Sequence, residues 1–91
     1  MLYQITYELK VKGKDYAPLY LAIKRMGDWA HPVETVWFIN SQLLLDEVSK
    51  TLSSHVDPRY DKILVTMVSH NGIGGRASTE FWKWLRNIYA V

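Results

Sequence analysis

The chain opens with strict alternation of apolar and polar side chains over residues 2–10. On one side of an extended chain lie Tyr3 and Ile5, and on the other lie Thr6 and Glu8. Alternation of this kind is typical of a strand that places one face against a core. The pattern therefore predicts a first strand with a polar second face and a carboxylate close to its end.

A helical period follows. Asp15 is suited to cap a helix that runs to about Met26, because its carboxylate can accept a hydrogen bond from the first turn. Pro18 falls in that turn, where proline costs little, and Gly27 is expected to end the helix. The stripe that faces the core is expected to comprise Tyr16, Leu19, Ile23 and Met26.

Residues 29–40 have the composition of strand, but His31-Pro32 interrupts them. Proline belongs at sheet edges and bulges, so this stretch predicts a short edge strand at 30–33 and a firmer strand at 35–39. Asn40 or Ser41 is then expected to cap a second helix. Its apolar stripe is Leu44, Leu45, Val48 and Leu52, with Asp46, Glu47 and Lys50 outside.

The last third of the chain holds one more strand and one more helix. Residues 62–69 are apolar on both sides of an extended chain, which predicts a strand covered on both faces. A final helix is expected to begin at Ser78. Its inward side chains are predicted to be Phe81, Trp84, Leu85 and Ile88.

The order strand, helix, strand, strand, helix, strand predicts an α+β ferredoxin-like sandwich with a four-stranded antiparallel sheet and an added C-terminal helix. The 91 residues form a single domain, residues 1–91. Right-handed crossovers place the first two helices on one face and make strands one and three the central pair. The uncovered face is expected to hold Thr6, Glu8, Trp37 and Ile39. A bare face of this kind usually meets another subunit or a ligand.

Composition narrows the class of protein. Hydrophobic residues make up 48% of a chain too short to bury a large core, which favours a homodimer. The absence of cysteine excludes disulfides and thiolate metal sites. No basic-then-apolar leader and no long apolar run occurs, so we expect a cytoplasmic protein with no membrane partner.

The net charge of +2 is small, but the basic residues gather in two stretches. One stretch is the first loop, and the other lies near the C-terminus. Together they predict a basic face that would bind RNA or DNA, and the alternative is an ordinary solvated loop and helix. The candidate nucleic-acid-binding residues are Lys10, Lys12, Lys14, Arg76 and Lys83.

Spaced residues along nearly the whole chain resemble the SinR-like proteins, which are small relatives of the CRISPR-associated adaptation nuclease and of virulence-associated protein D. The closing aromatic segment is similar to the tryptophan-leucine helix with which many SinR-like proteins end. The residues that carry the resemblance are Tyr3, Ile5, Tyr7, Glu8 and Leu9, then Gly13, Lys14, Asp15 and Tyr16, then Gly27, Asp28 and Trp29, then Thr35, Val36 and Trp37, and last Phe81, Trp82, Lys83, Trp84 and Leu85.

The resemblance implies a ferredoxin-like homodimer formed across the sheets. In the nuclease branch an aspartate ends the first strand, and the dimer brings two such carboxylates to a shared divalent metal. The matching position here is Glu8, which could act as a catalytic residue and Mg²⁺ ligand. The alternative for Glu8 is an exposed carboxylate paired with Lys10.

The loop at residues 70–77 is rich in glycine. It matches the spacing of a dinucleotide fingerprint, but no strand and no acidic residue follow at the required distance, so that interpretation fails. A simpler hypothesis is a phosphate loop, in which Gly72, Gly74 and Gly75 expose backbone N–H groups beside Arg76. The alternative is a flexible connection to the last helix.

The remaining candidates carry less information. The three histidines show no zinc spacing. Among the tryptophans, Trp82 lies off the main helix stripe and is the better exposed candidate for stacking on a base, whereas Trp37 and Trp84 are expected in the core or an interface.

We therefore expect a small homodimer that acts by binding, with RNA or DNA as its first candidate partner, without robust catalysis and without a cofactor. One alternative is a Mg²⁺-dependent endonuclease that uses paired Glu8 carboxylates. Another is a protein-interaction or regulatory module, such as an antitoxin-like or mobile-element accessory factor with a protein partner.

Overall fold

A computed structural model describes residues 1–89 of the chain. The elements in order are β1 (Leu2–Glu8), α1 (Ala17–Lys24), β2 (Asp28–Val33), β3 (Val36–Asn40), α2 (Leu45–Ser53), β4 (Lys62–Met67), a short 3₁₀ turn η1 (His70–Gly72) and α3 (Thr79–Tyr89). None of these helices has the length and apolarity needed to cross a membrane.

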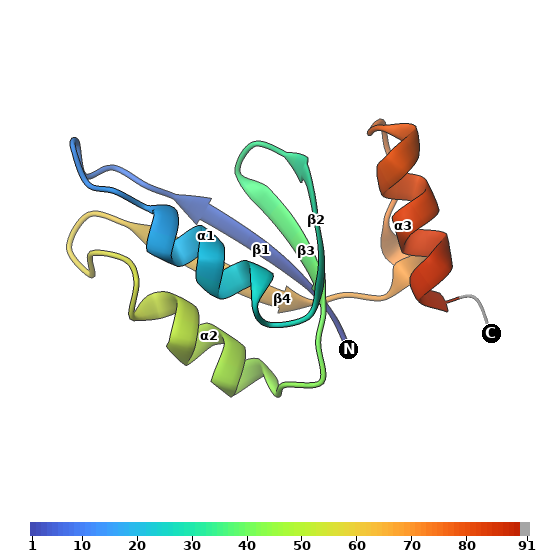
Figure 1. Cartoon of the computed structure of the whole chain (residues 1–91), viewed down its shortest axis with the longest axis horizontal. Coiled ribbons are helices and arrows are strands. Elements are labelled where there is room, and N and C mark those ends of the chain that lie inside the picture. Colours follow the sequence, from blue (N-terminus) through green and yellow to red (C-terminus); the bar gives the residue numbers. More distant parts are fainter. Residues whose placement is uncertain (90–91) are drawn as a thin grey trace.

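The four strands form one sheet in the order β2-β3-β1-β4, and each neighbouring pair is antiparallel. The helices α1 and α2 lie side by side on one face of this sheet, whereas α3 stands apart beyond one end of it (Figure 1). The predicted ferredoxin-like α+β sandwich with an added C-terminal helix is therefore confirmed, including the central position of β1 and β3.

The main core lies between the sheet and the first two helices. Its fully buried residues include Tyr3 and Ile5 from β1, Leu19 and Ile23 from α1, and Val48 and Leu52 from α2. These are the stripes that the two sequence periods indicated. Burial of each of these large side chains stabilises the fold by about 1.5–3 kcal/mol.

The predicted face of two residues of β3 was wrong. Trp37 pairs with Ile5 and Ile39 pairs with Tyr3. Because directly opposed residues on neighbouring strands share a face, both side chains enter the main core and not the uncovered face. On β3 it is Val36 and Phe38 that point to the second face, together with Gln4 and Thr6 of β1.

The tyrosines of β1 fit in this core because their hydroxyls find partners. The Tyr3 hydroxyl donates to the backbone oxygen of Leu43 at 2.8 Å. The Tyr7 hydroxyl donates to the backbone oxygen of Glu34 at 3.1 Å and accepts from Trp37 Nε1 at 3.1 Å. Burial raises the pKa of both hydroxyls, so they remain protonated donors.

The second face of the sheet is covered only at one end. There the aromatic ring of Phe81 packs on Phe38, and Leu2 and Leu85 complete a small second core. The rest of this face is open: the side chain of Leu64 on β4 is 69% exposed. The expectation that β4 would be covered on both faces was therefore wrong, because α3 packs against β2 and on Phe38 of β3 and leaves Leu64 of β4 exposed.

The predicted roles of two capping positions also change. The second helix begins at Leu45 with Leu44 as its cap residue, and Glu47 accepts from the Leu44 N–H at 3.3 Å. The hydroxyl of Ser41 instead accepts from the Leu43 N–H at 3.1 Å in the preceding turn. Neither Asn40 nor Ser41 caps the helix.

Gly27 does more than follow a helix end. The last residue of α1 is Lys24, and Gly27 lies two residues beyond its cap with φ of 157°. A Cβ atom at this position would overlap the backbone oxygen of Asn40 and lie 2.9 Å from its carbonyl carbon. The chain can enter β2 here because glycine has no side chain to clash with β3.

Candidate functional site

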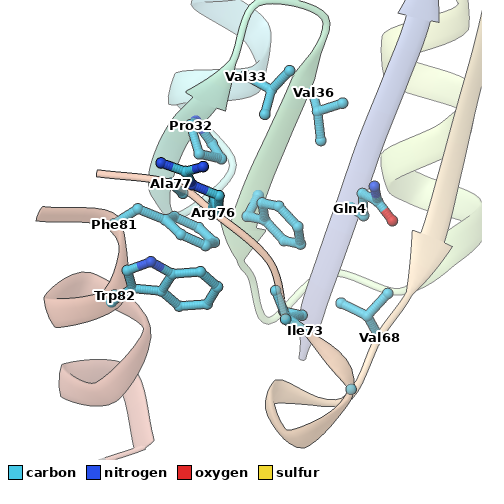
Figure 2. Close-up of a pocket in the computed structure, with 13 residues that line it drawn as sticks. Gln4, Pro32, Val33, Val36, Val68, Ile73, Arg76, Ala77, Phe81 and Trp82 are labelled. Atoms are coloured by element: carbon cyan, nitrogen blue, oxygen red, sulfur yellow. The ribbon is translucent and has the colours of Figure 1, made fainter. Parts of the chain in front are cut away.

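A groove lies on the second face of the sheet, between the strands and the segment that follows β4 (Figure 2). It encloses a volume of about 310 Å³. Residues of β1, β2 and β3 form one side of the groove, and the loop after β4 and the start of α3 form the other side. The residues that line it are Gln4, Pro32, Val33, Val36, Phe38, Val68, Gly72, Ile73, Gly74, Arg76, Ala77, Phe81 and Trp82.

The packing of α3 shapes this groove. The ring of Phe81 lies 5.3 Å from that of Phe38, and the ring of Trp82 meets Phe81 edge-on at 5.0 Å. Both rings extend from α3 toward the sheet (Figure 2). The hydroxyl of Ser78 accepts from the Phe81 N–H at 3.2 Å and fixes the first turn of the helix. The aromatic wall is therefore held in place by the second core.

The groove combines apolar walls with two polar side chains. Arg76 brings a guanidinium from the loop, and Gln4 brings an amide from β1 on the opposite side (Figure 2). Arg76 is exposed and forms no salt bridge with any carboxylate in residues 1–89. A half-buried tryptophan, Trp82, lies on the same wall. The arrangement suits a ligand with a flat face, a hydrogen-bonding edge and a negative charge.

The glycine loop contributes to the groove in part. Gly72 and Gly74 line it, whereas Gly75 does not. Ser78 already satisfies one N–H at the start of α3, and Glu80 adds a negative charge in the first turn. A phosphate at this helix end would meet that carboxylate, so the guanidinium of Arg76 is the better attraction for an anion.

The two basic stretches lie apart. The loop that carries Lys10, Lys12 and Lys14 is at one end of the long axis, and α3 is at the other (Figure 1). Within that loop, Lys14 donates to the His55 backbone oxygen at 3.3 Å and lies 4.0 Å from a carboxylate of Asp61. One chain therefore does not join these lysines to Arg76 and Lys83 in a single basic face. Lys83 is exposed on α3 but does not line the groove.

Glu8 lies on the open part of the second face, near the end of β1. Its carboxylate pairs with Lys10 at 3.2 Å, and both side chains are more than half exposed. No three His, Asp or Glu side chains within residues 1–89 gather where they could hold a metal ion. A metal site at Glu8 would therefore need ligands from a second chain.

A buried carboxylate that sequence reasoning missed is Asp61. It accepts the backbone N–H groups of Lys10 and Asp57 at 2.8 and 2.9 Å, and the Tyr16 hydroxyl at 2.8 Å. Burial alone would raise the pKa of Asp61, but these hydrogen bonds outweigh it and hold the pKa below its usual value. These contacts join the turn before β4 to the loop after β1 and to Tyr16, the cap residue of α1, so this cluster has a structural role.

The tryptophans also differ from the sequence expectation. Trp29, on the edge strand β2, is 41% exposed and carries the ammonium of Lys24 4.9 Å from its ring. Trp82 and Trp84 are only half-buried, so Trp29 and not Trp82 is the most exposed tryptophan. Trp82 is nevertheless the one that lines the groove beside Arg76.

The fold and the groove define a small ferredoxin-like α+β protein with an aromatic and basic groove on the second face of its sheet. Comparisons with protein-family models, with curated proteins and with solved structures found no match to this chain. The resemblance to SinR-like proteins stays a prediction that depends on the spaced residues alone.

Proposed function

We propose that this protein is a cytoplasmic, homodimeric nucleic-acid-binding protein that holds single-stranded RNA or DNA in the groove on its second sheet face. The observation that supports this most directly is that Arg76 and Trp82 line one groove. The proposal includes no catalytic step.

The chemistry of the groove matches that of a single nucleotide. Base stacking on an aromatic side chain is tolerant of sequence and stabilises binding by about 1–3 kcal/mol per base. The guanidinium of Arg76 would face a phosphate, and the amide of Gln4 can both donate to and accept from a base edge. The volume of about 310 Å³ lies at the lower end of the range for small-ligand pockets, so one base would enter and the rest of the strand would lie outside.

A single strand fits this site better than a duplex. The groove is walled by side chains of α3 on one side and by the sheet on the other, so a base must leave its stack to enter it. Bases of single strands are already free to be splayed out and stacked on protein side chains. Lys83 lies outside the groove and would attract the backbone only at longer range.

The test is fluorescence anisotropy of labelled single-stranded RNA and DNA oligonucleotides, measured over a series of salt concentrations. Trp82→Ala is expected to weaken binding by about 5- to 150-fold through the loss of stacking. Arg76→Gln is expected to weaken binding and to reduce the slope of log K against log salt by about 0.7, the value for one phosphate contact on a single strand.

Two matched controls test the location of the site. Lys12→Gln removes an equal charge from the far loop, and Trp29→Ala removes the exposed tryptophan outside the groove. Both variants are expected to bind as the unaltered protein does. Absence of binding to any oligonucleotide at low salt would refute the proposal, and so would equal losses for Lys12→Gln and Arg76→Gln.

A further inference from the structure

The two edges of the sheet are protected to very different degrees. The edge strand β2 contains Pro32, shows a register shift between Ala30 and Val33, and lies beside α3. Proline and bulges are the devices by which natural sheets prevent an edge from pairing with another chain. The β2 edge is therefore closed to further strands.

The opposite edge has none of these devices. β4 pairs with β1 without interruption from Lys62 to Met67 and contains no proline. Its exposed apolar side chains are Leu64, at 69%, and Met67, at 53%. The only charged residue in the strand is Lys62, at its first position. A regular, uninterrupted edge that exposes apolar side chains is a template for another strand.

The hydrogen bonds of β4 show which of its groups are available. The Val68 N–H donates to the Leu2 oxygen at 2.9 Å, so Val68 and Leu2 form a hydrogen-bonded pair. Such pairs alternate along an antiparallel ladder, and the residues between them turn their backbone groups away. Ile63, Val65 and Met67 therefore point their N–H and C=O groups toward the free edge.

We propose that this edge is a homodimer interface, in which β4 pairs antiparallel with β4 of a second copy about a two-fold axis at Val65. The two Val65 residues would exchange hydrogen bonds with each other, and Ile63 of each copy would exchange them with Met67 of the other. The two sheets would then form one continuous sheet. The inference concerns assembly and does not depend on the proposed nucleic-acid binding.

In this register β4 is complementary to a second copy of itself, so we infer that the partner at this edge is another copy of the chain. Leu64 lies next to Thr66 of the other copy on the second face, and Ile63 lies opposite Met67 on the helix face. The two-fold axis places the two Lys62 side chains at opposite ends of the interface, where they do not repel. An isologous contact of this kind closes on itself and gives a dimer.

The edge-to-edge dimer differs in geometry from a dimer in which the two Glu8 carboxylates bind one metal ion. Glu8 pairs with Lys62, three residues from the axis along β4 and one strand further out. From the rise per residue and the strand spacing, the two Glu8 backbones would lie about 25 Å apart. The edge-to-edge dimer therefore offers no metal site shared by two Glu8 carboxylates.

The experiment combines sedimentation with amide hydrogen exchange measured by NMR on the full chain. We expect a species of twice the 10.6 kDa chain mass that dissociates on dilution. The amides of Ile63, Val65 and Met67 should exchange slowly in the dimer and become fast on dilution, whereas those of Leu64 and Thr66 stay protected throughout. A monomer at about 100 µM, or a dimer with fast exchange at Val65, would overturn the proposal.

Variants give an independent test of the same interface. Val65→Pro removes an N–H that β1 does not use, and the two-fold axis doubles the loss, so the dimer dissociation constant is expected to rise about tenfold or more. If that variant does not fold, Leu64→Lys serves instead, because Leu64 is exposed in the single chain. The control is Leu21→Lys, an exposed leucine on α1, which should leave the dimer unchanged. Equal effects of Leu64→Lys and Leu21→Lys would contradict the edge interface.

Discussion

The close approach of Gly27 to β3 makes a sharp prediction about stability. Alanine at this position would adopt a φ of 157°, which side chains rarely accept, at a cost of about 1–3 kcal/mol. Its Cβ would also overlap the Asn40 backbone, and the backbone shift needed to relieve this overlap costs about a further 1–3 kcal/mol. Together these terms predict that Gly27→Ala lowers the free energy of unfolding by about 2–6 kcal/mol. A chain of 91 residues has only about 5–14 kcal/mol in total.

The assay is urea unfolding followed by tryptophan fluorescence, for which buried Trp37 is an internal reporter. The matched control is Gly13→Ala: Gly13 has φ of 76°, but no atom lies within 4 Å of an added Cβ. Its cost is conformational strain alone, about 1–2 kcal/mol. If Gly27→Ala loses no more stability than Gly13→Ala, the packing of β2 against β3 at Asn40 is not as described.

Three further predictions concern other parts of the chain. Leu52→Ala, at a fully buried position of the main core, is expected to reduce the free energy of unfolding by about 2–5 kcal/mol in the same urea assay. Because the pKa of Asp61 is lowered in the folded state, its stabilising contribution is present above the ordinary value of 3.8 and is lost as the pH falls below it. The melting temperature should therefore decrease when the pH is lowered below about 4. The Asp61→Asn variant should have a lower melting temperature at neutral pH, and its melting temperature should depend less on pH in this acid range. Glu8→Gln removes only an exposed ion pair, so the free energy of unfolding should change by less than about 1 kcal/mol and oligonucleotide binding should persist. Mg²⁺-dependent cleavage that disappears in Glu8→Gln would instead establish the nuclease alternative.

The fold could be predicted from sequence because its main signals are local. Alternation in β1 and the stripes of α1 and α2 identify each element by its own residues, and the handedness of the crossovers then fixes the strand order. The facing of β3 could not be predicted in this way. This strand is apolar at four successive positions, Val36, Trp37, Phe38 and Ile39, so no alternation with polar residues shows which side chains face the core. Only the register with β1 decides which pair is buried.

The candidate site was predictable in pieces and not as a whole. Arg76 and Trp82 were both candidates from sequence, but their meeting in one groove depends on the packing of Phe81 on Phe38 across the sheet. The lysines of the first loop looked equivalent to Arg76 by charge alone. These lysines lie at the far end of the molecule because β1 separates them from the groove. Amino-acid composition does not contain this information.

Asp61 shows the same limit for a buried polar group. Its partners come from the loop after β1, the start of α1 and the turn before β4, so no local pattern marks it. A sequence signal did exist, since Asp61 directly precedes an apolar strand and follows the turn at Asp57. A carboxylate that is buried at that point must find hydrogen-bond donors.

The placement of α3 links the two proposals. By packing beside β2 and over Phe38, this helix shields one edge of the sheet and builds the aromatic wall of the groove at the same time. It leaves the second face of β4 open at Leu64. The free edge and the groove therefore lie on different strands and can be occupied together. An edge-to-edge dimer keeps the second faces of both sheets on one side, and each copy presents its groove there. A single-stranded RNA or DNA that is bound in one groove would be present at a raised local concentration at the other groove. This strengthens binding without any new contact.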